Sequence, residues 1–526
     1  MHFFAFKSDL DNLFSKHSQN KTFSLDSSTS VAKQKTHFFE CIRSFGEITP
    51  LDKKLSLEEL KSIFKKPDVI FIKVHGEKTP PLWDIIPKRA LIHSLGNFLF
   101  PESLLLLTRS SFNTIYLVTT DFQMIRLKKY LGKAAPLMAV FTPKLDDVNF
   151  FPPTKQQRLI ARKNLGILEK EVHIVYAGRW LATKGICQLI RVLNLWPFEN
   201  LKITLVGAFN PDFPIRQVSA SHFTFTNYFK REFILRNKDK RIRLLKAREA
   251  ADLKEILWSA DLFVYASIHE DENFGMAPRE AVLCGIPVVA TDFCGLHPLA
   301  LQMPWGGIAT YPTFSGPRYS LYQFRNLITQ AIKRKEWVTE ERIISVKKEC
   351  NPDISKSNLE KAIKLLLKMP LENKVEMHNI EKRRSLELLK YAHHNILSTF
   401  IEKKEKIPDG GLVDGTGLYM EKFSYTKLFQ AMQELYSTMN KAPVVKAGDI
   451  LRGFSRLALW REENTLVEFG FPGPRMKHYN DKEWNLLISC IKFERTSEIT
   501  ICPIKKDEIN LAQELVDLGY IVPDFY

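Results

Sequence analysis

Short apolar runs alternate with stretches of helical length from the start of the chain to about residue 370, and this alternation constrains the fold most. The runs are Phe3–Phe6, Val69–Val74, Ala90–His93, Thr114–Val118, Leu137–Phe141, Val172–Ala177, Lys202–Val206, Leu262–Tyr265 and Pro287–Ala290. Buried parallel strands have this length and composition, and the helices between them cover both faces of the sheet. The sequence therefore predicts an α/β fold with parallel sheets.

A pair of prolines marks the boundary between two such α/β units. They lie in the segment Asn149–Lys155, and adjacent prolines favour extended chain over helix. We expect an N-terminal Rossmann-like domain over residues 1–152, which would bind an acceptor, and a second Rossmann-like domain over residues 153–370, which would bind a donor.

The sequence changes character after the second domain. Charged helical segments predict a helical linker over residues 371–422, and residues 423–526 form a separate α+β unit. That unit has a hairpin pattern in 456–470 and then a helix whose start, Asn480 with Glu483 three residues on, is typical of a capping box. It resembles a winged-helix module. Its role stays open between packing or homo-oligomerisation, acceptor or peptide recognition, and nucleic-acid binding.

The charge balance favours anionic partners. Lys and Arg number 76 against 59 Asp and Glu, a formal net charge of +17. Such a field attracts nucleotide diphosphates, anionic lipid surfaces or nucleic acid. The basic residues are dispersed along the chain, so charge alone selects no partner.

Cysteine usage and hydropathy indicate a soluble cytoplasmic protein. The seven cysteines contain no C-x-x-C pair, so we expect neither a disulfide framework nor a zinc site. The first residues lack the basic and apolar pattern of a secretory signal. The most apolar stretch, Leu91–Leu107, is interrupted by His93, Asn97, Pro101 and Glu102, so no membrane span is expected.

The segment from residue 260 to 291 has the order strand, loop, helix, strand. Its helix begins near Gly275, with a proline in the first turn and a glycine at the end. The helix N-terminus therefore lies at the carboxyl end of a parallel strand. There, the backbone N–H groups of Gly275, Met276 and Ala277 suit a phosphate oxygen.

Two carboxylates flank this helix start. Glu272 lies in the preceding loop and Glu280 lies one to two turns into the helix. One can accept hydrogen bonds from sugar hydroxyls and the other from ribose hydroxyls, with the phosphates between them. Alternatively, Glu280 is an exposed glutamate favoured by the helix dipole, and Glu272 is a loop residue that adds solubility.

A second segment, from residue 174 to 185, favours the nucleotide hypothesis. A strand runs into Gly178, and Arg179 and Lys184 follow in a short loop before the next helix. Two cations in such a loop can neutralise a diphosphate leaving group, and electrostatic stabilisation of this kind is often the largest catalytic contribution. The alternative is an ordinary surface loop.

These motifs in this order resemble the donor domain of retaining GT-B glycosyltransferases of family 4. The resemblance rests on Gly178-Arg179, Lys184-Gly185, Leu205–Gly207, the Glu272–Glu280 pair and Cys284–Ala290, and it extends over roughly residues 60–370. It implies a GT-B fold of two Rossmann-like domains facing a cleft. It also implies a nucleotide-diphosphate sugar donor, no metal ion or other cofactor, and transfer with retention, in which the leaving phosphate helps to deprotonate the acceptor.

The family's site residues carry over motif by motif. Arg179 and Lys184 are expected at the diphosphate, Glu280 at the ribose and Glu272 at the transferred sugar. The candidate donor-binding residues are Gly178, Arg179, Lys184, Gly207, Glu272, Asn273, Phe274, Gly275, Met276, Ala277 and Glu280. The candidate catalytic residues are His93, Glu272, Arg179 and Lys184, and no metal ligand is predicted. Asn273 departs from the family, where glycine is common.

The catalytic histidine has two candidates. His93 ends an N-terminal strand where the family often has a histidine near the sugar, and His75 ends the preceding strand. Either can instead be a hydrogen-bonded histidine at a strand end.

We therefore expect a metal-independent hexosyltransferase that moves a sugar from a nucleotide-diphosphate donor to a glycan, a lipid-linked sugar, or a peptide or protein. Peripheral membrane contact and a homo-oligomer formed through the C-terminal unit are further expected interactions. The main alternative is a non-catalytic GT-B-like binding protein whose C-terminal unit engages a peptide, protein or nucleic acid. A GT-B sugar-nucleotide epimerase is a third hypothesis.

Overall fold

The structure is a computed structural model of the chain. It describes residues 2–6, 30–51, 55–64, 66, 68–74, 89–93, 114–131, 137–194, 200–207, 229–230, 233–234, 237, 240–246, 250–269, 272–311, 313, 317–334, 338–369, 412–413, 419–420, 443–449, 451–453, 457–460, 465–468, 475–478, 480–492, 504–517 and 521–523.

The chain divides into two compact units. Unit 1 comprises Met1–Asp147, Asn273–Met276 and Ile344–Ala392, and unit 2 comprises Val148–Glu272, Ala277–Ile343 and His393–Tyr526. The division after Asp147 lies close to the predicted linker at the proline pair, where the backbone is neither helix nor strand.

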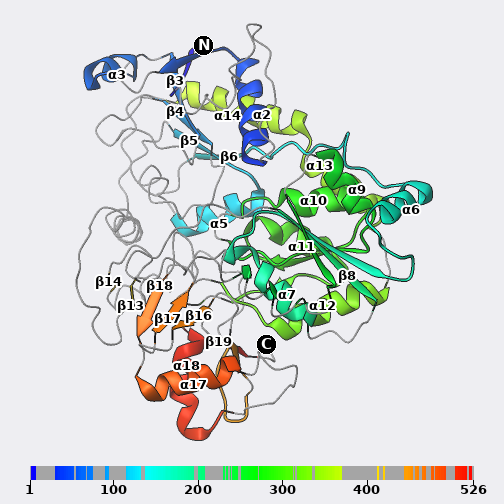
Figure 1. The fold of residues 1–526 in the computed structure, drawn as a ribbon. Coiled ribbons are helices and arrows are strands. Elements are labelled where there is room, and N and C mark those ends of the chain that lie inside the picture. The colour runs from blue at the N-terminus through cyan, green and yellow to red at the C-terminus, as the bar shows by residue number, and fades with distance from the viewer. Residues whose placement is uncertain are drawn as a thin grey trace. The chain divides into compact units, whose positions relative to one another are not determined.

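Unit 1 contains a six-stranded parallel sheet (Figure 1). Its strands in spatial order are β2 (Glu47–Leu51), β1 (His2–Phe6), β3 (Val69–Val74), β4 (Ala90–His93), β5 (Thr114–Val118) and β6 (Leu137–Val140). Five of these six strands were predicted. The sixth, β2, has the sequence EITPL, whose proline and polar residues conceal a strand; it lies at the edge of the sheet, where a proline is tolerated.

The second domain was predicted to end at residue 370, and the division of the chain places residues 344–369 in unit 1. Helix α14 (Pro352–Lys368) carries Leu359, Ile363 and Leu366 on one face, at helical spacing. These side chains are buried in one core with residues of α2 (Ser30–Arg43) and of the first sheet. The buried Arg89 guanidinium also donates hydrogen bonds to the last carbonyl groups of α14.

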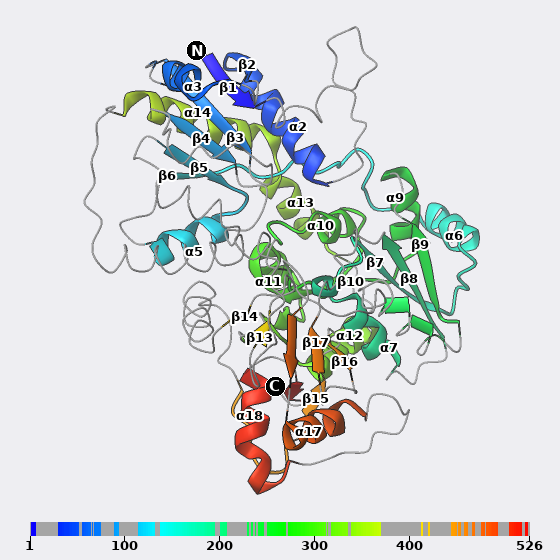
Figure 2. The same ribbon diagram turned by 60° about the vertical axis from the view of Figure 1, so that its left-hand side comes forward.

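Unit 2 contains a second six-stranded parallel sheet, which appears beside α6, α7 and α12 in Figure 2. Its strands in spatial order are β12 (Ile308–Ala309), β11 (Val288–Asp292), β10 (Leu262–Tyr265), β7 (Val172–Ala177), β8 (Leu201–Gly207) and β9 (Ile242–Lys246). The strands β9 and β12 were not predicted. Two Rossmann-like sheets are nevertheless present, as the predicted GT-B fold requires, and the chain reverses its direction of travel across the second sheet between β7 and β10.

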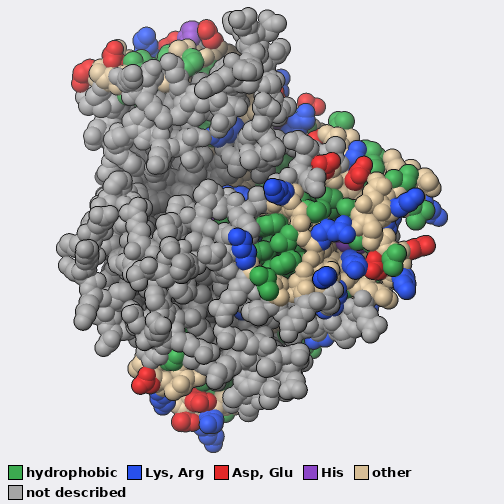
Figure 3. Space-filling view, in the orientation of Figure 1, with side chains coloured by type: hydrophobic (Ala, Val, Ile, Leu, Met, Phe, Trp, Pro, Cys, Tyr) green, Lys and Arg blue, Asp and Glu red, His purple; other side chains and the backbone are tan. Residues whose placement is uncertain are grey.

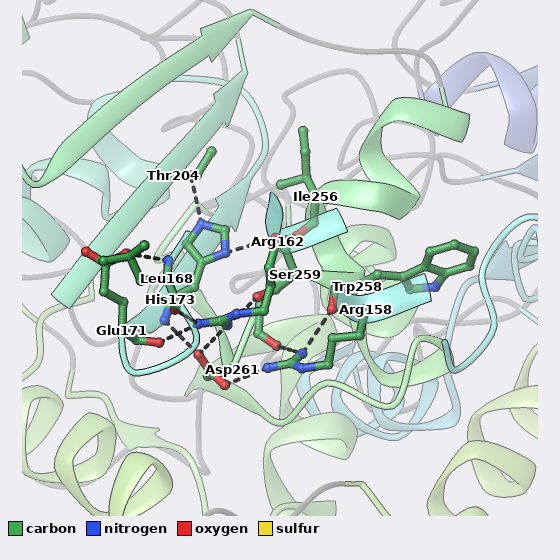
Figure 4. A network of polar contacts seen from close by, with 11 residues as sticks. Arg158, Arg162, Leu168, Glu171, His173, Thr204, Ile256, Trp258, Ser259 and Asp261 are labelled. Atoms are coloured by element: carbon green, nitrogen blue, oxygen red, sulfur yellow. Dashed lines mark hydrogen bonds and ion pairs between the residues drawn. The ribbon is translucent and has the colours of Figure 1, made fainter. Parts of the chain in front are cut away.

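The amino ends of β7 and β10 are held by one partly buried polar network (Figure 4). Helix α6 (Lys155–Asn164) supplies Arg158 and Arg162, whose guanidinium groups lie 2.6 and 3.1 Å from the two carboxylate oxygens of Asp261. The same carboxylate accepts the backbone N–H of His173 at 2.8 Å. Charged hydrogen bonds of this kind stabilise by about 1.5–3 kcal/mol each. The network thereby fixes the two strands that flank the reversal.

His173 is a neutral histidine within this network. The Ser259 hydroxyl donates to the Ile256 carbonyl, so it accepts from His173 Nδ1, and His173 Nε2 in turn accepts from the Thr204 hydroxyl at 2.8 Å. Burial lowers the pKa of His173 to about 4. The folded protein thus keeps this ring uncharged at a pH where an unfolded chain would begin to protonate it.

The C-terminal region confirms several local predictions. The hairpin consists of β16 (Leu457–Trp460) and β17 (Thr465–Glu468), and helix α17 (Asp481–Lys492) starts at a capping box in which Asn480 and Glu483 exchange hydrogen bonds. The other strands here are β13 (Leu412–Val413), β14 (Tyr419–Met420), β15 (Leu451–Gly453), β18 (Arg475–His478) and β19 (Ile521–Pro523), and the last helix is α18 (Ile509–Asp517).

The remaining C-terminal predictions are settled only in part. Most of the predicted helical linker over 371–422 lies outside the described residues, and its described part is strand, because β13 pairs with β14 and β18. The winged-helix resemblance of residues 423–526 stays a prediction.

The described helices include none that is long and apolar enough to cross a membrane. On the face drawn in Figure 3, Lys and Arg side chains lie scattered among acidic and apolar ones, in agreement with the dispersed charge of the sequence.

The neutral state of His173 predicts a pH dependence of stability. Above about pH 6.5 the His173 ring is neutral in both the folded and the unfolded protein. Below this pH, protonation of the ring in the unfolded chain favours unfolding, until the pH reaches the folded-state pKa of about 4. Lowering the pH from 7 to 5 should therefore cost roughly 2 kcal/mol of unfolding free energy through this residue. Urea unfolding of the wild type and of His173→Gln at both pH values measures the effect. Identical losses in the two proteins would contradict it.

Candidate functional site

The candidate site lies at the carboxyl ends of β7 and β10, where the strand order of the second sheet reverses. In open α/β sheets the loops at such a reversal diverge and leave room for a ligand. The loop after β7 carries Gly178, Arg179 and Lys184, and the loop after β10 carries Glu272. Sheet topology therefore brings the two predicted motifs, about ninety residues apart in the sequence, to the same place.

The loop after β7 is compact and depends on glycine. Lys184 ends a short 3-10 turn, Ala182–Lys184, and Gly185 follows with φ +74° before α7 (Ile186–Asn194). A Cβ atom on Gly185 would lie 2.1 Å from the carbonyl oxygen of Ala266, just after β10. A Cβ atom on Gly207, which ends β8, would lie 2.0 Å from the Gly178 carbonyl oxygen. Both glycines permit backbone approaches that no side chain allows.

Lys184 and Glu272 form a buried ion pair. The ammonium nitrogen of Lys184 lies 2.5 Å from Glu272 Oε2, and the two residues are only 5% and 6% exposed. Burying two charges costs several kcal/mol per ion, which mutual attraction repays only with good geometry. The alternatives of a surface loop and a solubilising glutamate are therefore wrong for these two residues. Charged groups held at such a cost in a strand-end loop point to a functional site.

Two stacked tyrosines line the pair. The rings of Tyr176 and Tyr265 have centroids 5.7 Å apart, and the Lys184 ammonium lies 5.8 Å from the centroid of Tyr265. Burial raises the pKa of Tyr265 well above its usual value, and the nearby Glu272 carboxylate raises it further. The hydroxyl therefore stays protonated and can donate to Glu272. The uncharged rings on one side of the ion pair lower the local dielectric constant and so strengthen the attraction between Lys184 and Glu272.

A second contact clamps the two loops together. The Thr183 hydroxyl lies 2.8 Å from His269 Nδ1, and the Thr183 carbonyl accepts the backbone N–H of Ile268 at 2.8 Å. Thr183 and His269 are both buried, and each lies one to three residues from a member of the ion pair. This pair was not predicted from the sequence. The only available signal was a histidine inside the loop after a predicted strand.

Helix α10 (Met276–Leu283) begins directly after Gly275, where the motif predicted its start. Gly275 has φ +75°, a conformation that favours glycine. The Glu272 carbonyl accepts the backbone N–H of Gly295, and the fully buried Arg279 donates to the Gly295 carbonyl. The first turn of α10, with Met276 and Ala277, is thus anchored to the turn after β11, a contact that was not predicted from the sequence.

The other predicted donor-binding residues are placed as follows. Glu280 lies in the second turn of α10 and is 8% exposed, so the alternative of an exposed, dipole-favoured glutamate is wrong. Arg179 is exposed in the same loop as Lys184, and Phe274 is buried. The structure brings Lys184 and Glu272 into direct contact. The roles of Arg179 and Glu280 in donor binding stay predictions.

Of the two candidate catalytic histidines, His93 and His75, the structure describes His93. His93 ends β4 in unit 1, is 1% exposed, and packs against the rings of Phe38 and Phe141 at centroid distances of 4.7 and 5.3 Å. This environment is that of a packed core ring, and a role at the sugar stays a prediction. His75 lies outside the described residues.

Within the described ranges, no three His, Cys, Asp or Glu side chains gather in a way that could hold a metal ion. The Glu272 carboxylate is paired with the Lys184 ammonium.

Comparison with known proteins finds a family match for one segment of the chain. Residues 157–300, which run from α6 through the β7 loop and α10 to the turn after β11, match the family described as Glycosyl transferases group 1. All of the predicted donor-binding residues lie inside the matched segment.

Individual relatives are distant. D-inositol 3-phosphate glycosyltransferase of Corynebacterium urealyticum is 28% identical over 188 residues, covering 35% of this chain and 42% of that protein, and its counterpart in Pseudarthrobacter chlorophenolicus is 28% identical over 178 residues, covering 31% and 39%. This chain thus matches about two fifths of the length of these curated relatives. Among solved structures, HepE of Anabaena in complex with UDP and glucose is 14% identical, with 69% of this chain and 100% of that chain covered and a TM-score of 0.45.

The contact between Gly185 and Ala266 predicts a large difference between two glycine substitutions. Gly185→Ala combines a positive φ with a backbone clash and should cost about 3 kcal/mol or more of unfolding free energy. Gly166→Ala is the matched control, because Gly166 also has a positive φ, +63°, but nothing lies within 4 Å of its added Cβ; it should cost only about 1–2 kcal/mol. Chemical denaturation measures both. Equal costs would show that the close approach of the two loops is absent.

Proposed function

We propose that this protein is a retaining glycosyltransferase that uses a nucleoside-diphosphate sugar, and the match of residues 157–300 to the group 1 glycosyl transferases supports the proposal. The observation that carries the proposal is the buried Lys184–Glu272 ion pair beside the start of α10, at the strand reversal of the second sheet. A diphosphate sugar presents anionic oxygens next to hydroxyl groups. A cation and a carboxylate in contact offer both kinds of partner within one small volume.

Each group of the site has a distinct task in this proposal. The Lys184 ammonium, the exposed Arg179 and the N–H groups at the start of α10 stabilise the charge that grows on the leaving diphosphate. The Glu272 carboxylate accepts hydrogen bonds from the transferred sugar, and Glu280 accepts them from the ribose. The leaving phosphate then assists deprotonation of the acceptor hydroxyl, which attacks from the same face and gives retention.

The ion pair also responds to the change in charge during the reaction. Before transfer, Glu272 offsets the charge of Lys184, and the protonated Tyr265 hydroxyl can donate to Glu272. When the glycosidic bond to the diphosphate lengthens, negative charge appears on the phosphate oxygen and draws the Lys184 ammonium more strongly. Attraction that is stronger in the transition state than in the bound donor accelerates transfer.

The rest of the sequence-based expectations belong to the same proposal. The acceptor is a glycan, a lipid-linked sugar, or a peptide or protein, and turnover requires no metal ion. The cytoplasmic location, the membrane contact, the homo-oligomer and the role of His93 stay predictions.

Neutralising both members of the ion pair tests the proposal. A single substitution would strand a buried charge, at about 3–5 kcal/mol, and confuse unfolding with loss of function. The double variant Lys184→Met with Glu272→Gln leaves no unpaired charge, so we expect a melting temperature near that of the wild type. Donor hydrolysis and transfer should fall by roughly 100-fold or more. Sugar release from a panel of nucleotide sugars, with calorimetric melting, measures both.

The exposed Lys170 gives the control, because Lys170→Met should keep both the stability and the turnover of the wild type. Turnover in the double variant that equals the wild type would refute the site assignment. Nucleotide-sugar binding by the wild type without any sugar release would favour the non-catalytic binding protein instead.

The ribose role of Glu280 has a separate kinetic signature. Glu280→Gln keeps the side-chain size and removes the charge that strengthens hydrogen bonds to the ribose hydroxyls. Since the ribose is bound equally in the ground and transition states, KM for the donor should rise about tenfold while kcat changes little. Initial-rate kinetics measure this, with the exposed Glu169→Gln as control. A fall in kcat at constant KM would assign Glu280 to the reacting sugar and contradict the ribose role.

A further inference from the structure

Helix α6 and the turn after it expose apolar side chains to solvent. Leu159 and Ile160 lie on the outer face of α6 and are 51% and 48% exposed, and Leu168 in the following turn is 56% exposed. The Arg162 guanidinium of α6 donates to the Leu168 carbonyl at 2.6 Å, so this turn lies against the helix. Isolated exposed apolar residues are common on protein surfaces, whereas a group of them indicates an interaction surface.

Cations surround these apolar side chains. Three exposed lysines lie in the same segment, and Glu169 is the only acidic residue over 155–170. The exposed Arg243 of β9 adjoins them, because its guanidinium donates to the Leu165 carbonyl at the end of α6. In Figure 3, blue and green side chains lie together at the right, where Figure 1 labels α6. The α6 surface is defined here as Lys155, Leu159, Ile160, Lys163, Leu168 and Lys170, all of which belong to unit 2.

The α6 surface and the Lys184–Glu272 pair lie at opposite ends of the second sheet. Arg158 and Arg162 bind α6 to Asp261, which directly precedes the amino end of β10. The ion pair instead follows the carboxyl ends of β7 and β10. A large body bound to the α6 surface therefore leaves the loops of the ion pair uncovered.

The composition of the α6 surface favours an anionic lipid membrane over a protein partner. Protein interfaces are enriched in aromatic residues and Arg and depleted in Lys, whereas the cations of this surface are lysines and its apolar residues are Leu and Ile. Helices that lie on membranes insert apolar side chains at the headgroup boundary and place Lys and Arg against anionic lipids. Contact with a second copy of the same surface would bring like charges together, which disfavours self-association.

We propose that the α6 surface docks this protein on anionic membranes, with its Leu and Ile side chains inserted among the lipid headgroups and its lysines against the lipid phosphates. This inference does not depend on the proposed function. Each lysine near an anionic lipid surface strengthens binding by about fivefold, and salt screens this attraction. The inserted apolar side chains add a contribution that salt does not screen.

Co-sedimentation of the full chain with lipid vesicles tests the electrostatic contribution. Vesicles of phosphatidylcholine alone are compared with vesicles of equimolar phosphatidylcholine and phosphatidylglycerol. The charge variant combines Lys155→Gln, Lys163→Gln and Lys170→Gln. Its matched control removes the same number of exposed charges from α12 (Leu321–Arg334) and from α14, by Lys333→Gln, Lys361→Gln and Lys368→Gln.

A second pair of variants tests the apolar contribution. The apolar variant combines Leu159→Gln with Ile160→Gln. Its control combines Leu301→Gln with Ile344→Gln, which are 63% and 55% exposed elsewhere in the chain. The melting temperature and donor hydrolysis in solution are measured for all variants. Both should equal those of the wild type, because the substituted side chains are exposed and lie outside the donor-site loops.

We expect the wild type to sediment with the mixed vesicles and not with phosphatidylcholine alone, and salt to weaken its binding. The charge variant should bind the mixed vesicles on the order of 100-fold more weakly. The apolar variant should bind about tenfold more weakly. Both controls should bind as the wild type does.

Three results would overturn the proposal. Equal losses in the charge variant and its control would assign vesicle binding to the net charge of +17 rather than to the α6 surface. Unchanged vesicle binding by the apolar variant, with equally tight binding of the wild type to soluble dextran sulfate, would make the surface a site for polyanions. A wild type that does not bind the mixed vesicles would exclude the membrane and leave a protein as the partner of this surface.

Discussion

One buried ion pair, between Lys184 and Glu272, is the interaction on which the functional account depends. Its members come from loops that follow β7 and β10, and they meet because the strand order of the second sheet reverses between those strands. The pair is costly in free energy unless its geometry is held firmly. The molecule holds it from two directions, through the Thr183–His269 contact beside the pair and the Asp261 network at the opposite strand ends.

The need to hold this ion pair explains why the loops around it are tightly fixed. The glycines at 185 and 207 let backbones approach closely, and the hydrogen bonds to Gly295 anchor the loop that carries Glu272. These contacts hold the charged groups of Lys184 and Glu272 in place before a ligand binds. Within the described residues, the amide atoms of Asn273 make no hydrogen bond, which is uncommon for a buried polar side chain. Such exceptions to polar satisfaction are expected at binding sites.

Much of this could be predicted from the sequence, because local patterns determine it. The nine predicted strands follow from apolar runs, and the two motif loops follow from glycine and charge spacing. The strands β2, β9 and β12 were missed because their residues are polar, basic or too few to form a pattern. Long-range packing was also invisible: nothing near α14 indicates that its apolar face returns to the first sheet, and nothing near His269 indicates Thr183 as its partner.

The central claim is that the Lys184 ammonium contacts the diphosphate of the donor. Phosphorus-31 NMR of UDP and of GDP, titrated with the wild type and with the variant Lys184→Met with Glu272→Gln, tests this contact directly. The account predicts that the β-phosphorus resonance of one nucleotide shifts on binding to the wild type, and that the variant loses this shift and binds about tenfold more weakly. The same β-phosphorus shift and the same affinity in both proteins would contradict it.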